Sequence, residues 1–221
     1  MREPVQWRSL GLCAYDDALA QQEAAWDACR HGGPDMCFAV EHPPTITLGR
    51  RDTRDDLRRS TSELARLGVA LHATERGGGA TYHGPGQLVV YPIVRLAAHG
   101  LTVQAFVWRL DAIMLAIAAA TGVAAERDPE RGHGIWTAAG KLGALGIRVR
   151  DGVTTHGLAL NVDLDLGGFA LIAPCSVPGL PVTSLRREGS TATVADLLPI
   201  AERACRRFLA APTAREAEAR L

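Results

Sequence analysis

Apolar and polar residues follow two different spacings along this chain. Seven short stretches alternate between apolar and polar residues or are rich in β-branched ones, as strands are, and three longer stretches repeat every three to four residues, as amphipathic helices do. The predicted strands cover residues 5–10, 36–41, 45–48, 69–74, 88–94, 143–150 and 153–161. The predicted helices cover residues 16–29, 102–120 and 193–209, and a capping box at residues 60–63 opens a short fourth helix that ends at Gly68.

The inventory of these elements predicts the fold class. Strands outnumber helices, and the sequence contains no internal repeat and no linker. We predict an α/β (α+β) fold in which helices flank a mixed, mostly antiparallel sheet. Residues 1–221 are expected to form a single domain, with a frayed tail after about residue 212.

Composition and charge exclude several classes of protein. The 221 residues are 47% hydrophobic and 22% charged, which supplies enough apolar surface for a folded core. Twenty-four basic residues balance 24 acidic ones, so the net charge is zero and a nucleic-acid binder is disfavoured. The five cysteines include no C-x-x-C pair, which predicts neither a disulfide framework nor a zinc site and indicates a reducing compartment.

Segments that would enter or cross a membrane are not expected. The N-terminal segment lacks the apolar core of a signal peptide. Residues 112–125 form the longest uncharged stretch in a predicted helix, and they are fewer than the roughly 18 that a membrane span needs. We therefore expect a cytoplasmic protein that binds no membrane. A monomer is the default expectation, because nothing in the sequence suggests an obligate partner helix.

A glycine-rich segment, RGGGATYHGPGQ at residues 76–87, is the first candidate site. Three consecutive glycines allow backbone N–H groups to approach a ligand closely, and the neighbouring Thr, Tyr, His and Gln supply polar groups. The segment is not a phosphate-binding P-loop, because the order G-x-x-x-x-G-K-[ST] is absent. It is therefore either a binding loop or a flexible hairpin loop.

An Asp-Gly dipeptide at residues 151–152 predicts a two-residue hairpin turn. With this turn Gly146 faces Gly157 and Ala144 faces Ala159, so one face of the hairpin carries very small side chains. Such a face leaves a shallow trough that either a chain-like ligand or a closely packed helix can fill. On the opposite face, His156 is expected to be a buried core histidine.

Lys141 is the only lysine among the 24 basic residues. Codon bias explains the arginines, but arginine cannot replace lysine where a proton must be exchanged. The hairpin pairing puts Lys141 opposite Val162, on the face away from the trough. A bulge or bend near Gly140 or Gly143 would be needed to turn it into the trough.

Cys175 lies in a proline-punctuated loop, between Pro174 and Ser176. A loop cysteine becomes a nucleophile when a nearby cation stabilises its thiolate. Since Lys141 is predicted to pair with a residue shortly before this loop, a pair formed by Cys175 and Lys141 is sterically reasonable.

Four runs of residues together resemble the lipoyl(octanoyl) transferases of the biotin/lipoate protein ligase superfamily. They are RGGGATYHGPGQ (76–87), GKLGALGIRVR (140–150), THGLALNVDLDL (155–166) and IAPCSVPGL (172–180). The resemblance implies the fold of the biotin/lipoate protein ligase catalytic domain. It also implies transfer of an octanoyl or lipoyl group from acyl carrier protein to a lysine of lipoyl domains, in 2-oxoacid dehydrogenase complexes and glycine cleavage H protein, without ATP or metal.

The resemblance also implies roles for residues of this chain. Cys175 matches the acyl-accepting cysteine, which forms a thioester, and Lys141 matches its acid/base partner. The residues that match substrate-contacting positions are Arg76, Gly77, Gly78, Gly79, Ala80, Thr81, Tyr82, His83, Ala144, Leu145, Gly146, Gly157, Leu158 and Ala159.

Three other functions remain open from the residues. An ATP-dependent lipoate or biotin ligase would need the lysine but no cysteine nucleophile. A cysteine hydrolase would use Cys175 with His83 or His156 and pass the acyl group to water. In an acyl-binding module Cys175 would be incidental.

An arginine-rich segment is a candidate docking surface for acidic acyl carrier protein. Aspartates interleave with its arginines, so a solvated surface is an equally good interpretation. The arginines are Arg50, Arg51, Arg54, Arg58 and Arg59.

Overall fold

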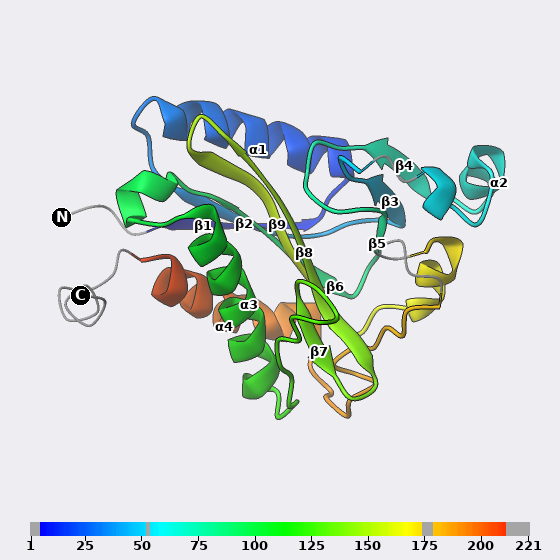
Figure 1. Cartoon of the computed structure of the whole chain (residues 1–221). Coiled ribbons are helices and arrows are strands. Elements are labelled where there is room, and N and C mark those ends of the chain that lie inside the picture. The colour runs from blue at the N-terminus through cyan, green and yellow to red at the C-terminus, as the bar shows by residue number, and fades with distance from the viewer. Residues whose placement is uncertain (1–4, 52–53, 174–178, 211–221) are drawn as a thin grey trace.

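A computed structural model describes residues 5–51, 54–173 and 179–210 of the chain. Its larger sheet has six strands in the order β1-β2-β6-β9-β8-β7 (Figure 1). Only the β1–β2 pair in this sheet is parallel, and the other four pairs are antiparallel. The strands are β1 Gln6–Leu12, β2 Met36–Glu41, β6 Gln87–Ile93, β7 Ile135–Thr137, β8 Gly140–Arg150 and β9 Val153–Asn161.

A smaller sheet of three strands, in the order β4-β3-β5, lies beside the first. Its strands are β3 Thr45–Leu48, β4 Ala70–Ala73 and β5 Thr81–His83. Its own hydrophobic core includes Ile46, Leu64 of α2 (Thr61–Arg66) and Ile172. The smaller sheet carries the glycine-rich segment, because residues 74–80 connect β4 to β5.

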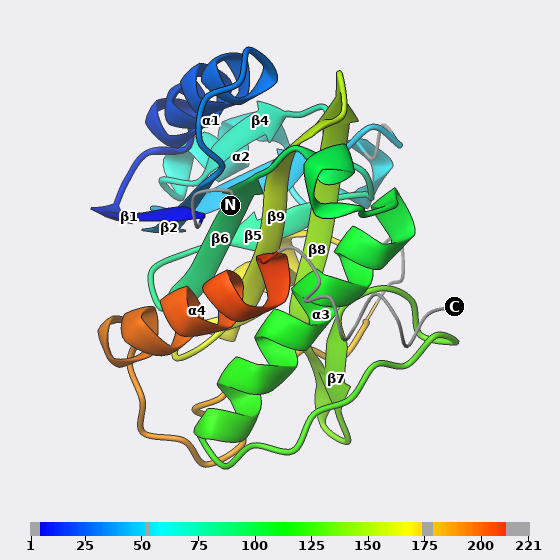
Figure 2. The same cartoon turned by 90° about the vertical axis from the view of Figure 1, so that its left-hand side faces the viewer.

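Three long helices cover the two faces of the larger sheet. Helix α1 (Tyr15–Arg30) packs on one face, where Ala18 and Trp26 join the apolar side chains of β2, β6 and β9. Helices α3 (Val103–Ala120) and α4 (Val194–Leu209) pack on the other face, as Figure 2 shows. The larger hydrophobic core lies between these two helices and the sheet.

Helix α3 begins where Thr102 caps it, since the Thr102 side chain accepts a hydrogen bond from Ala105 N. Phe106, Leu110 and Ile113 follow at the spacing of one helix face, and all three are fully buried. By length and composition α3 is apolar enough to cross a membrane, but its apolar face belongs to the core of this fold.

The predicted fold class is confirmed, with differences in detail. Two short strands were not expected, β5 inside the glycine-rich segment and β7 before β8. The division of the strands between two sheets was not expected either. β8 begins at Gly140, three residues earlier than predicted. Short strands escape a periodicity analysis because three residues are too few to show alternation.

Candidate active site

A cavity of about 630 Å³ lies between the β8–β9 hairpin and the glycine-rich segment. It brings together the substrate-contacting residues proposed from the sequence, with the exception of Tyr82. The predicted residues that line it are Arg76, Gly77, Gly78, Gly79, Ala80, Thr81, His83, Lys141, Ala144, Leu145, Gly146, Gly157, Leu158 and Ala159. Cys175 lies outside the residues that the structure describes.

The small-residue trough has the predicted register. Gly146 pairs with Gly157 and Ala144 with Ala159, and the hairpin turns through Asp151 and Gly152. A side chain at Gly146 would come within 2.8 Å of the carbonyl oxygen of Gly77, so the glycine lets the loop approach the strand. These small residues therefore form one wall of the cavity, as the first of the two interpretations predicted.

Lys141 lines the same cavity because β8 contains a bulge. The pairing advances by one residue on β7, from Ile135 to Trp136, but by two residues on β8, from Gly143 to Lys141. Leu142 is the extra residue, and its side chain is fully buried in the core beneath α3 and α4. The predicted bulge near Gly143 is confirmed, and it turns Lys141 toward the trough.

The segment that follows the cysteine loop in the sequence runs beside Lys141. Lys141 N donates a hydrogen bond to Pro181 O over 2.8 Å, and Thr183 N donates one to Lys141 O over 3.0 Å. The predicted pairing of Lys141 with Val162 is therefore wrong, because Val182 takes that place. A β-bridge of this kind joins segments far apart in the sequence, and alternation cannot reveal it.

The surroundings of Lys141 are aromatic and acidic. Its Nζ lies 4.9 Å from the ring centroid of Trp136, and its side chain is 6% exposed. Asp111 is the only acidic residue of α3 and is also buried. Burial raises the pKa of Asp111 to about 6, although Arg127, the Gly134 N–H and Lys141 each favour its charged form. Both the ring and the carboxylate attract the positive charge of Lys141.

Arg76 fixes the glycine-rich segment over the cavity. Its Nη2 donates to Thr47 O over 2.7 Å, and its Nε donates to Thr47 Oγ1 over 3.1 Å. Gly77 N donates to Ile147 O over 2.9 Å, which attaches the segment to the edge of β8. The glycine-rich segment is therefore fixed at two places: Gly77 is anchored on β8, and residues 81–83 form strand β5.

Tyr82 is the one described residue of the predicted set that does not line the cavity. In β5 its neighbours Thr81 and His83 face the cavity, so alternation turns Tyr82 to the other side. There its ring packs edge-on against Phe169, with 5.6 Å between the ring centroids. Tyr82 therefore belongs to the core of the smaller sheet.

A chain of buried side chains links His83 to the segment beside Lys141. His83 Nδ1 and Gln87 Oε1 are 2.7 Å apart, Gln87 Nε2 donates to Asn161 Oδ1 over 2.9 Å, and Asn161 Nδ2 donates to Thr183 O over 2.9 Å. Burial and the nearby His42 lower the pKa of His83 to about 3, so its ring is neutral. Because Gln87 Oε1 can only accept, His83 carries its proton on Nδ1.

Asn161 was missed by the sequence analysis, which named Gln87 as a polar group of the glycine-rich segment but not among the substrate-contacting residues. Each is an uncharged polar residue at the end of a strand whose other residues are mostly apolar, and each lies in a run that carries the family resemblance. A buried polar side chain needs a partner, so this placement was a usable signal. Two tyrosines of the cavity, Tyr15 and Tyr91, gave no such signal.

His156 lies on the cavity side of the hairpin, not on the predicted opposite face. It pairs with Ile147 as expected, but its φ of 58° is left-handed and breaks the alternation of β9. Its ring packs edge-on against Tyr91, with 6.4 Å between centroids. Burial and the guanidinium groups of Arg76 and Arg148 lower its pKa to about 4.

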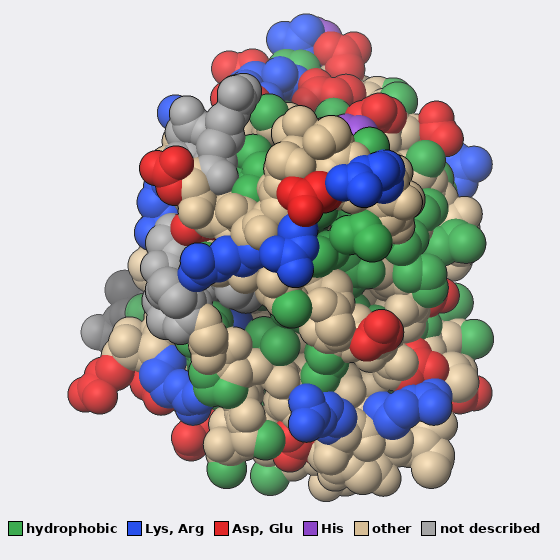
Figure 3. Space-filling model, turned by 90° about the vertical axis from the view of Figure 1, so that its right-hand side faces the viewer, with side chains coloured by type: hydrophobic (Ala, Val, Ile, Leu, Met, Phe, Trp, Pro, Cys, Tyr) green, Lys and Arg blue, Asp and Glu red, His purple; other side chains and the backbone are tan. Residues whose placement is uncertain are grey.

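The arginine-rich segment lies at the surface near the cavity. Arg50, Arg51, Arg58 and Arg59 are exposed, and Arg51 lines the cavity itself. Arg58 and Arg59 line a second cavity of about 710 Å³ together with apolar residues such as Leu57. Figure 3 shows several groups of Lys and Arg side chains on this face of the molecule, next to hydrophobic and acidic side chains.

Comparison with known proteins identifies the family. A family model described as the lipoyl protein ligase A/B catalytic domain matches residues 14–206. The mitochondrial octanoyltransferase LIP2 of Arabidopsis thaliana is 41% identical over 186 residues, which cover 84% of this chain and 79% of that protein. An octanoyltransferase of Chloroflexus aurantiacus is 43% identical over 198 residues, which cover 88% and 87%.

Solved structures show the same fold at low sequence identity. A crystal structure of lipoate-protein ligase A bound with ATP has a TM-score of 0.77 at 15% identity, and it covers 99% of this chain and 92% of that one. A bipartite lipoate protein ligase of Thermoplasma acidophilum has a TM-score of 0.78 at 14% identity, covering 99% and 90%. The chain therefore belongs to the lipoyl protein ligase A/B catalytic domain family, as an acyltransferase of its octanoyltransferase branch that acts in protein lipoylation.

Proposed function

We propose that this enzyme takes an octanoyl group from acyl carrier protein and transfers it to a lysine of lipoyl domains, such as those of 2-oxoacid dehydrogenase complexes and glycine cleavage H protein. Cys175 carries the acyl group as a thioester, with Lys141 as acid and base. One observation supports this most directly. The trough of small residues leads to buried Lys141, and the segment from Pro181 to Thr183, six residues beyond Cys175, is hydrogen-bonded to it.

In the first step the Lys141 ammonium stabilises the Cys175 thiolate. The thiolate attacks the carbonyl carbon of the carrier thioester, and the carrier thiolate leaves with a proton from Lys141, which becomes a neutral amine. The octanoyl chain then lies along Ala144, Gly146, Gly157 and Ala159, where backbone and methyl groups contact it.

In the second step the amine of the lipoyl-domain lysine attacks the Cys175 thioester. An amide bond forms, the C–S bond breaks, and Lys141 accepts the surplus proton of the amine. Because thioester exchange is nearly balanced and amide formation is downhill, the reaction requires no ATP. In the described part of the chain, no three His, Cys, Asp or Glu side chains are grouped to hold a metal ion.

The exposed arginines near the cavity suit the acidic carrier as the donor. Arg51 lines the cavity, and Arg58 and Arg59 lie on the same segment, so negative charge on the carrier would bring its acyl group toward Lys141. Reversing the charge of Arg58 and Arg59 should raise KM for the carrier at low salt.

Intact-protein mass spectrometry tests the covalent relay. The enzyme is mixed with octanoyl-acyl carrier protein without ATP, alongside Cys175→Ser and Lys141→Arg. We expect one octanoyl adduct on the unmodified enzyme, no adduct on Cys175→Ser and slow formation on Lys141→Arg, because arginine keeps the charge but does not exchange the proton. Adding a lipoyl domain should remove the adduct.

A parallel reaction with free octanoate and ATP separates the alternatives. Modification of the lipoyl domain only in that reaction would indicate a ligase. Loss of the adduct to water without any lipoyl domain would indicate a hydrolase. Octanoyl binding without an adduct, equal in the unmodified enzyme and Cys175→Ser, would indicate a binding module.

A further inference from the structure

His156 has an unusual backbone conformation for a residue in the middle of a strand. In the described part of the chain only two residues other than glycine have a positive φ, Asp151 and His156. Asp151 occupies the two-residue turn of the hairpin, where a positive φ is required. No turn explains His156, whose conformation is costly and persists only where the surroundings impose it.

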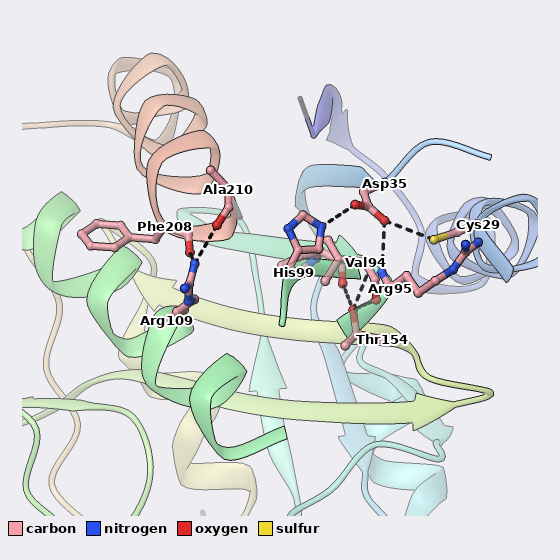
Figure 4. Close-up of polar contacts among 10 residues, drawn as sticks. Cys29, Asp35, Val94, Arg95, His99, Arg109, Thr154, Phe208 and Ala210 are labelled. Carbon is pink, nitrogen blue, oxygen red and sulfur yellow. Dashed lines mark hydrogen bonds and ion pairs between the residues drawn. The ribbon is translucent and has the colours of Figure 1, made fainter. Parts of the chain in front are cut away.

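A buried hydrogen bond holds the His156 backbone in place. On α1, Gln22 is fully buried, and its Oε1 accepts a hydrogen bond from His156 N over 2.8 Å. The β6–β9 ladder ends at the Val90–Leu158 pair, and Pro92, two residues further along β6, has no N–H to offer a ladder. Thr154 donates its hydroxyl to Pro92 O over 2.7 Å instead and also contacts Val94 (Figure 4).

The left-handed conformation sends the His156 ring into the cavity. The even-numbered residues that follow His156 in β9, Leu158 and Leu160, belong to the core beneath α3 and α4. His156 would join them if alternation continued, but it lines the cavity beside Tyr91. Since its pKa is lowered to about 4, the ring is neutral at pH 7 and can border an apolar chain.

The position of His156 coincides with the end of the trough. No residue of β8 after Ile147 and none of β9 before His156 lines the cavity. The glycine-rich segment crosses at the same point, where Gly77 N donates to Ile147 O. From Ala144 to Ile147 the strand rises about 10 Å, which is similar to the length of an extended eight-carbon chain.

We infer that His156 closes the end of the acyl trough remote from Lys141 and thereby sets the length of the acyl chain that the enzyme transfers. This inference rests on the proposed function, because it takes the trough to hold the acyl group. A chain of eight carbons fills the space up to the ring, while a longer chain meets it.

Donors of different length test this inference. Acyl transfer to a lipoyl domain is measured with hexanoyl-, octanoyl-, decanoyl- and dodecanoyl-acyl carrier protein. His156→Gly removes the ring and suits the left-handed backbone, and His156→Asn also tolerates it with a shorter side chain. We expect the ratio of decanoyl to octanoyl transfer to rise on the order of tenfold in His156→Gly, and by less in His156→Asn.

His99→Asn is the matched control. His99 is as buried as His156, but it pairs with Asp35 over 2.6 Å away from the cavity (Figure 4). The loss of His99 should leave the ratio of decanoyl to octanoyl transfer unchanged. Octanoyl transfer with an unchanged ratio in both His156 variants would overturn the inference and leave the proposed function intact. Absence of transfer by the unmodified enzyme from every donor would overturn both.

Discussion

The β8–β9 hairpin has two faces that differ in packing. The face toward α3 and α4 carries large side chains such as Leu142 and Leu160, which are fully buried in the main core. The face toward the glycine-rich segment carries Ala144, Gly146 and Gly157 and borders the cavity. Alternation along the two strands, shifted by the bulge at Leu142, thus separates the residues that stabilise the fold from those that leave room for a substrate.

Filling the trough should have the largest effect, and on activity alone. In Ala144→Leu the longer side chain occupies space that the acyl chain needs, so octanoyl transfer should fall on the order of 100-fold. The midpoint of thermal unfolding should change little, because the side chain extends into a cavity and not into packed core. Steady-state transfer and a melting curve on the same sample check both parts. Unaltered transfer would place the acyl chain elsewhere.

Shortening a large side chain on the face toward α3 and α4 should lower stability and leave activity nearly unchanged. Leu160→Ala removes a fully buried side chain of the main core, and the free energy of unfolding should fall by about 2–5 kcal/mol. Transfer per folded molecule should remain within a few-fold of the original value, since Leu160 does not line the cavity. Urea unfolding and activity at 10 °C, where the variant is still folded, measure the two quantities. A large loss of activity in folded protein would show that the faces are coupled.

Buried titratable groups on the two sides of the sheet change the stability of the protein in opposite directions as the pH falls. On the cavity side, the pKa values of His83 and His156 are lowered to about 3 and about 4, so their contribution to stability is present above pH 6.5 and is lost as the pH falls toward those values. On the α3 side, the pKa of Asp111 is raised to about 6, so its contribution is lost as the pH rises from about 4 through 6.

The two histidines outnumber the single carboxyl, so the enzyme should be less stable at pH 5 than at pH 7.5, by about 2 kcal/mol. Urea unfolding at both pH values measures the difference. Asp111→Asn removes the opposing contribution and should enlarge the loss at pH 5. Equal stability at the two pH values would contradict the assignment of neutral buried histidines.

Removing the cap of α3 should have the smallest effect. Thr102→Ala loses the hydrogen bond from Ala105 N, which should lower the free energy of unfolding by about 1 kcal/mol. Octanoyl transfer should not change, because Thr102 is remote from the cavity. Thr102→Ser, which retains the hydroxyl, is the control. A loss as large as that of Leu160→Ala would mean that the cap supports the whole core.

Local patterns predicted the hairpin and its trough. The Asp-Gly turn determines the register of β8 and β9, so the facing pairs followed from counting alone. The parity of Lys141 conflicted with a role in the trough, and that conflict correctly indicated a bulge. In both cases the deciding residues lie within a few positions of the feature.

Features set by distant residues could not be predicted. The left-handed backbone of His156 depends on Gln22 of α1, 134 positions away, and no local pattern announces that hydrogen bond. Alternation within β5 decides that Tyr82 leaves the cavity, but three residues did not identify the strand. Likewise, the residue paired with Lys141 is Val182, which follows the cysteine loop in the sequence.

The bulge at Leu142 means that residue count carries information that residue identity does not. With Leu142 in the chain, a regular ladder would turn Lys141 toward the core beneath α3 and α4, and the bulge returns the lysine to the trough. Deleting Leu142 would remove the bulge together with a fully buried leucine, and Lys141, then two positions before Ala144, would still face the trough. One residue between the lysine and Ala144 would need no bulge, whereas the two residues of this chain need one.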